Sequence, residues 1–171
     1  MALTKPQQLN ELLQRAIDSY HAGHQPEAID LLARASKQFP KSARLWGYLG
    51  FLYAESGAGP NAVKAFRKAA QISPHSEQAS LGLFHSLWQL GRADDAFNEM
   101  RRFMKANDSP NYLELLRDML SDKGRRTSHA ASLTVEEVHE VEAISASVGK
   151  PGFEPIDLDE SADRLRELTH A

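Results

Sequence analysis

The ionisable side chains of this 171-residue chain show no catalytic or metal-binding pattern. Seven histidines are present, but His21 and His24 flank a turn, the others are scattered, and no HExxH or comparable ligand spacing occurs. The phosphate-binding and nucleophile motifs GxxxxGKS/T, GxGxxG and GxSxG are also absent. Because the chain has no cysteine, disulfides and cysteine nucleophiles are excluded. We therefore expect no catalytic residues, no metal and no cofactor, and a protein that is not an enzyme.

Two kinds of charged cluster could indicate other activities. The acidic residues Asp157, Asp159 and Glu160 stand together, but a helix N-terminus favours negative charge and explains them without catalysis. The arginine pairs at 101–102 and 125–126 could contact phosphate, yet isolated pairs are usually solvated, and the formal net charge is −3. No apolar run reaches the roughly 18 residues that span a bilayer, and the start lacks a signal-peptide core. We expect a cytoplasmic protein that binds neither nucleic acid nor membrane.

A 34-residue repeat organises most of the chain. Glycines and alanines recur at this spacing: Gly23, Gly57, Gly91, and Ala28, Ala62, Ala96. A fixed period of this length is typical of arrays of paired helices, which usually bind other polypeptides on a curved surface.

Apolar spacing and helix-ending residues predict the helices themselves. They are expected at residues 4–22, 26–38, 43–55, 60–71, 76–90, 93–105 and 111–120. Thr4, followed three residues later by Gln7, predicts a capping box at the start of the first. The last carries Tyr112, Leu115, Leu116 and Met119 on one face, and we expect it to cap the stack.

The second unit resembles the tetratricopeptide repeat family. The family's eight signature positions hold Trp46, Leu49, Gly50, Tyr53, Ala62, Phe66, Ala69 and Pro74. Gly50 and Ala62 are expected to be small where two helices touch, and Phe66 to meet the next unit. The third unit departs from the pattern, with Phe84 where a small residue is usual and Phe103 where alanine is usual.

The resemblance implies an all-α fold, a right-handed superhelical solenoid of antiparallel helix pairs. Beyond it, a capping-box pattern at residues 134–137 and the apolar residues that follow predict a short helical C-terminal extension. The expected parts are a repeat domain at 1–120 (repeats at about 9–42, 43–76 and 77–110, capping helix 111–120), a linker at 121–133, and an extension at 134–171 with two short helices.

In this family the first helix of each repeat lines the inner face. Helical spacing predicts the following inner-face residues: Asn10, Leu13, Ile17, Tyr20 and His21; Arg44, Gly47, Tyr48, Phe51 and Glu55; Gln78, Leu81, His85, Trp88 and Gln89. Among them we predict the partner-binding residues to be Tyr20, Arg44, Tyr48, Phe51, Leu81, His85 and Trp88. The alternative is that these aromatics pack against neighbouring helices. Gly47 costs its helix about 1 kcal/mol relative to alanine, which indicates close approach either by a ligand or by another helix.

These features predict a non-enzymatic module that binds a polypeptide segment in its groove. The resemblance implies the role of an adaptor or a secretion-type chaperone. Family members that bind acidic chaperone tails use lysine, arginine and asparagine, whereas the corresponding positions here hold Leu13, Ile17, Tyr48, Gln78 and Gly82. We therefore expect an apolar or amphipathic segment as the partner. The alternatives are an immunity protein that neutralises a cognate bacterial toxin, or a groove occupied by the chain's own residues 153–158.

Overall fold

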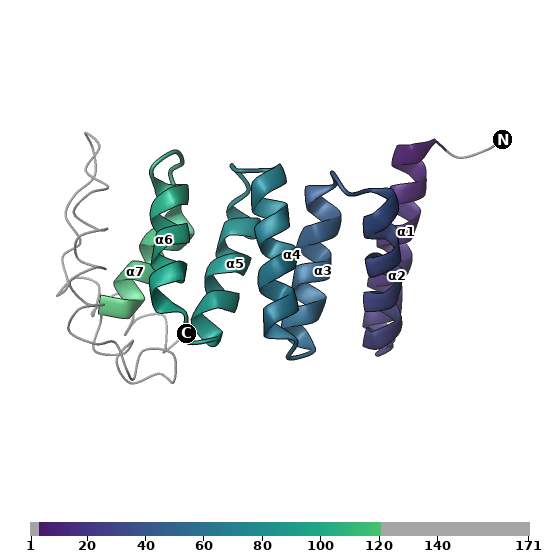
Figure 1. Ribbon diagram of the computed structural model, residues 1–171, viewed down its shortest axis with the longest axis horizontal. Coiled ribbons are helices and arrows are strands. Elements are labelled where there is room, and N and C mark those ends of the chain that lie inside the picture. The colour runs from purple at the N-terminus through teal and green to yellow at the C-terminus, as the bar shows by residue number, and fades with distance from the viewer. Residues whose placement is uncertain (1–3, 121–171) are drawn as a thin grey trace, which may run out of the picture. The chain divides into compact units, whose positions relative to one another are not determined.

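The computed structural model describes residues 4–120, and within that range the chain forms seven α-helices and no strand (Figure 1). The helices are α1 (Lys5–His21), α2 (Gln25–Gln38), α3 (Ala43–Glu55), α4 (Gly59–Ile72), α5 (Glu77–Gln89), α6 (Ala93–Met104) and α7 (Pro110–Leu120). The predicted all-α fold is confirmed, and each expected helix end agrees to within one residue. The predicted linker at 121–133, the extension at 134–171 and the segment 153–158 lie outside the described residues.

The described helices divide into two compact units, which separate between Ala96 and Phe97 inside α6. The first unit contains α1 to α5 and the start of α6, and the second contains the remainder of α6 together with α7.

In the first unit each helix packs against the next along the chain. Contacts join α1 to α2, α2 to α3, α3 to α4 and α4 to α5 (Figure 1). In addition, α3 contacts α5 directly. This contact places the first helices of two consecutive repeats side by side, so that their exposed faces belong to one surface.

The core between α1, α2 and α3 consists of leucines and alanines at helical spacing. Its buried members include Leu13, Ala16, Ala28, Leu32, Leu45, Leu49 and Leu52. Full burial of one leucine side chain contributes about 1.5–3 kcal/mol, so this stripe is a main source of the unit's stability. Leu13 corrects a prediction, since it was expected on the inner face and is completely buried. It shares the stripe of Ala16, which faces the other helices of the core.

Glycines in the left-handed conformation end the first helix of each repeat. Gly23, Gly57 and Gly91 have φ values of 83°, 76° and 71°. In each case the next N–H donates to the carbonyl five residues earlier: His24 to Ser19, Ala58 to Tyr53, and Arg92 to Leu87. A side chain is strained at this φ. The 34-residue glycine period therefore encodes the same helix C-terminus three times.

Side-chain caps set the starts of the helices that matter for the site. Ser42 Oγ accepts a hydrogen bond from the Leu45 N–H before α3, and Ser76 Oγ accepts one from the Ala79 N–H before α5. At α1 the predicted capping box is confirmed, with the Thr4 N–H donating to Gln7 Oε1 at 2.8 Å. Such caps satisfy N–H groups that have no partner inside the helix.

The second unit has its own aromatic core. Phe97, Phe103 and Tyr112 are almost completely buried, and the Phe103 and Tyr112 ring centroids are 5.9 Å apart. Leu116 and Met119 are also buried and Leu115 is half-buried, which agrees with the apolar face predicted for α7. The large residue at position 103 is thus accommodated by an aromatic contact within this unit.

Candidate functional site

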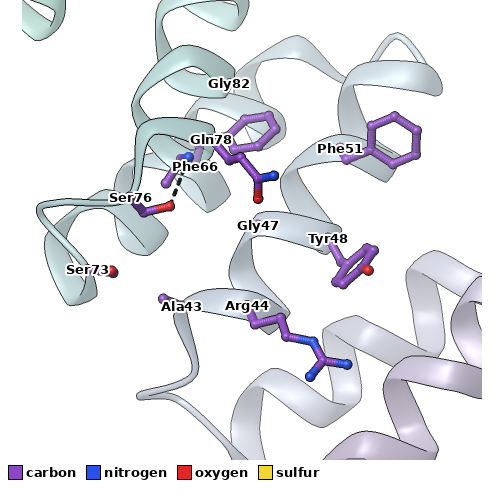
Figure 2. A pocket seen from close by; sticks show the side chains of 11 residues that line it. Ala43, Arg44, Gly47, Tyr48, Phe51, Phe66, Ser73, Ser76, Gln78 and Gly82 are labelled. Atoms are coloured by element: carbon purple, nitrogen blue, oxygen red, sulfur yellow. Dashed lines mark hydrogen bonds between the residues drawn. The ribbon is translucent and has the colours of Figure 1, made fainter. Parts of the chain in front are cut away.

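A groove of about 760 Å³ lies on the first unit between α3 and α5 (Figure 2). We call it the α3–α5 groove. Its lining residues are Ala43, Arg44, Gly47, Tyr48, Phe51, Phe66, Ser73, Ser76, Gln78, Ala79 and Gly82. Most of the lining comes from α3 and α5, so the groove follows the contact between these two helices.

The ring of Phe66, from α4, is held between two glycines of α3 and α5. A Cβ atom at Gly50 would lie 2.8 Å from Phe66 Cγ, and one at Gly82 would lie 2.3 Å from Phe66 Cε1. Only glycine leaves room for the ring at these positions. The ring is 9% exposed and lines the groove as part of its floor. The predictions that Gly50 is small at a helix contact and that Phe66 meets the next unit are both confirmed.

Gly47 lines the same groove, and among residues 4–120 the space beside its Cα is open. A Cβ atom built there has no neighbour within 4 Å. Helix–helix contact, one of the two explanations for this glycine, is therefore wrong. The space that Gly47 leaves free belongs to the groove.

A smaller depression of about 140 Å³ lies next to the groove, and we call it the α1–α3 pocket. Its lining residues are Ala16, Ile17, Tyr20, His21, Leu32, Tyr48, Phe51 and Leu52. Tyr48 and Phe51 line both depressions. The Tyr20 and Phe51 rings meet edge to face, with centroids 5.5 Å apart. We call Tyr48 and Phe51 the aromatic ridge, since they separate the two depressions.

The aromatic ridge is open to solvent. Tyr48 is 37% and Phe51 is 41% exposed, and Leu90 at 40% is the other exposed large apolar residue among those described. Adjacent apolar side chains between two hollows are typical of a docking surface. Aromatic residues also make effective anchors because they bury a large area with few rotatable bonds.

Polar groups frame the ridge at both ends of α3. Arg44 Nη1 donates to Asn10 Oδ1 at 3.3 Å, and the Tyr20 hydroxyl donates to Glu55 Oε2 at 3.5 Å. Among residues 4–120, Arg44 is the one charged residue that lines the α3–α5 groove. The site thus combines an apolar floor and ridge with charges at its ends, which suits binding and offers no nucleophile with an adjacent base.

The structure brings four of the seven predicted binding residues together. Arg44, Tyr48 and Phe51 line the α3–α5 groove, and Tyr20 joins the last two in the α1–α3 pocket. These four residues surround the exposed face of α3.

The three predicted binding residues of α5 lie outside both depressions. Leu81 is half-buried and His85 is exposed, and neither lines the groove or the pocket. Trp88 is half-buried and stacks on Phe84, with ring centroids 5.9 Å apart and planes 11° from parallel. A role for these three in partner binding stays a prediction.

Sequence reasoning missed several residues that form the groove. Ala43, Ser73 and Ser76 line its end near the helix N-termini, and Phe66 was expected only as a contact between repeats. A signal for Phe66 was available in the helical glycines Gly50 and Gly82, because a glycine inside a helix indicates close approach by a neighbouring group.

Over residues 4–120 no group of three or more His, Cys, Asp or Glu residues is placed to hold a metal ion. No helix in that stretch is long and apolar enough to cross a membrane.

Comparisons with known proteins agree with this architecture. Two models described as tetratricopeptide repeat match residues 13–77 and 54–119. The human PEX5-related protein is 28% identical over 91 residues, which is 53% of this chain and 14% of that protein's length. The crystal structure of PcrH in complex with the chaperone binding region of PopD is similar with a TM-score of 0.54 and 18% identity, over 86% of this chain and 98% of that one. This last likeness shows the fold.

Proposed function

The chain belongs to the tetratricopeptide repeat family, and from this premise we propose that it is a protein-binding module that accepts a polypeptide segment along α3. The segment would lie in the α3–α5 groove, cover the aromatic ridge and extend towards the α1–α3 pocket. The ridge carries this proposal, because two exposed aromatic side chains lie between two hollows that an apolar partner can fill. The lining favours an apolar or amphipathic segment.

Within this class we propose the role of an adaptor or a secretion-type chaperone, in the cytoplasm. PcrH, which shares the fold, is in complex with a segment of PopD that is described as a chaperone binding region. The PEX5-related protein supports the family, but this chain spans only 14% of it, so its activity is no guide to the role here. The immunity-protein role and occupation of the groove by residues 153–158 stay hypotheses.

The proposal can be tested by selecting ligands from a random peptide display library against the 171-residue chain. The most enriched peptide would be synthesised with a fluorescent label, and its Kd measured by fluorescence anisotropy. The double variant Tyr48→Ala/Phe51→Ala should weaken binding at least tenfold, because it removes two anchors of the kind that dominates interfaces. Its helicity should be nearly unchanged, since both side chains are exposed.

Leu90→Ala is the matched control. Leu90 is as exposed as Phe51 but lies outside both depressions, so this variant should bind the peptide as the wild type does. The ridge is not the binding site if no peptide is enriched more strongly on the wild type than on the double variant. The same conclusion follows if the selected peptide binds the double variant with the wild-type Kd.

A further inference from the structure

The helix that carries the ridge has one charged residue near each end. In α3 the charged residues are Arg44 and Glu55, eleven positions apart. Eleven residues are close to three helical turns, so both side chains lie on one face, about 16 Å apart along the axis. Tyr48 and Phe51 lie between them on the same face, which we call the α3 stripe. The stripe therefore runs from a cation through two aromatic rings to an anion (Figure 2 shows its Arg44 end).

These charges oppose the helix dipole. A helix favours negative charge at its N-terminus and positive charge at its C-terminus, whereas Arg44 is in the first turn of α3 and Glu55 in its last. Two other helices follow the rule: α2 has Glu27 early and Lys37 late, and α6 begins with acidic and ends with basic residues. A local arrangement that opposes stability is expected mainly at functional sites.

Contacts within the fold do not account for the reversed charges. Among residues 4–120 the hydrogen-bond partners of both are neutral, Asn10 for Arg44 and the Tyr20 hydroxyl for Glu55. Both side chains are exposed. A partner with charges of the opposite order would complete two ion pairs and relieve the unfavourable arrangement.

We propose that the α3 stripe selects an extended segment with large apolar residues in its middle, an acidic residue facing Arg44 and a basic residue facing Glu55. This inference rests on the proposed function. An extended chain rises about 3.3 Å per residue, so a 16 Å stripe corresponds to an acid and a base roughly five positions apart. A helical segment rises only 1.5 Å per residue, so it would instead need its acid and base about eleven positions apart.

The test uses three labelled peptides that share the apolar core selected by the wild-type protein. Their flanking residues, five positions apart, are acid and base, acid and acid, or base and base. The protein is used as wild type, Arg44→Glu, Glu55→Arg and the double variant Arg44→Glu/Glu55→Arg. A peptide can bind in either direction along α3, so each of its ends can face position 44 or position 55. The order of the three Kd values therefore reports the charges at positions 44 and 55 whichever direction the peptide takes.

The wild type should bind the mixed peptide best. Arg44→Glu should change the preference to the doubly basic peptide, Glu55→Arg to the doubly acidic peptide, and the double variant should restore the mixed one. Each exposed ion pair should change Kd about two- to fivefold, and the preference should shrink at high salt. Lys64→Glu, which makes the same charge change on the exposed face of α4, should leave the wild-type order intact.

An identical order of the three peptides with all four proteins would overturn the charge selection while leaving the groove as a binding site. If none of the three peptides bound the wild type although the selected parent peptide does, the charge selection would again be overturned. If the parent peptide did not bind either, the proposed function itself would fail, and this inference with it.

Discussion

Substitution of Gly47 should raise or preserve the stability of the fold while it weakens binding of the peptide, so this position distinguishes the two effects. A Cβ atom at this position meets nothing within 4 Å, although the residue lies inside α3. Gly47→Ala should therefore gain the helix propensity of alanine, about 1 kcal/mol, with no packing cost. For a chain of this length that corresponds to a rise in Tm of about 2–4 °C. Leucine is also a strong helix former, so Gly47→Leu should fold as well as the wild type.

Binding should respond in the opposite sense. The leucine side chain would project into the α3–α5 groove, which Gly47 lines, and would displace an apolar side chain of the bound segment. Burial of one large apolar side chain is worth about 1.5–3 kcal/mol, so the peptide Kd should rise roughly ten- to hundredfold. The single methyl of Gly47→Ala fills much less space and should change Kd at most about fourfold.

The measurements are thermal melting followed by circular dichroism, and anisotropy titration with the peptide selected on the wild type. The expected result is a stable Gly47→Leu variant that binds poorly. Normal binding by this variant would show that the segment does not enter the groove beside Gly47. A lower Tm for Gly47→Ala would show that the space around the residue is already filled, and the reasoning from its open environment would be wrong.

Three further substitutions test the same structure by thermal melting. Gly82→Ala should lower the free energy of unfolding by about 2 kcal/mol despite better helix propensity, because the added methyl would overlap the Phe66 ring. An unchanged Tm would contradict the position of that ring between Gly50 and Gly82. The exchange Arg44→Glu/Glu55→Arg should raise stability by about 1–2 kcal/mol by aligning both charges with the helix dipole, and a fall in Tm would contradict that reading. Burial raises the pKa of the Asp118 carboxyl, so its ionised form destabilises the fold near neutral pH. Asp118→Asn should therefore raise Tm at neutral pH, and this gain should vanish as the pH falls below the ordinary carboxyl pKa of 3.8. A gain in Tm that does not depend on pH would point to another cause.

The elements could be predicted because their signals are local and repeated. The glycines at 23, 57 and 91 each end a helix in a conformation that other residues avoid, and their period divides the chain into units. Apolar spacing then predicts which side of each helix is buried. With these two signals the seven helices were predicted to within one residue at each end.

The inner face was harder to predict, because a helical wheel does not tell how wide the buried stripe is. Leu13 is next to the inner face on the wheel, but it is completely buried in the core that α1 shares with α2 and α3. For Trp88 the missing information was a neighbour four residues earlier, since Phe84 offers a ring on which it stacks. The floor of the groove depends on Phe66 reaching across from a different helix, which spacing within one helix does not reveal.

Some of the residues that weaken α3 are compensated by packing inside the fold and others are not. The uncompensated ones mark the candidate binding surface. This helix of 13 residues contains two glycines and two charges that oppose its dipole, each unfavourable for an isolated helix. The cost of Gly50 is balanced inside the fold, because the Phe66 ring occupies the space of the missing side chain. Gly47, Arg44 and Glu55 have no such compensation from packing, and all three lie on the exposed side of the helix beside Tyr48 and Phe51. Since folding alone would favour different residues at these three positions, what they have in common is the surface that they offer to another molecule.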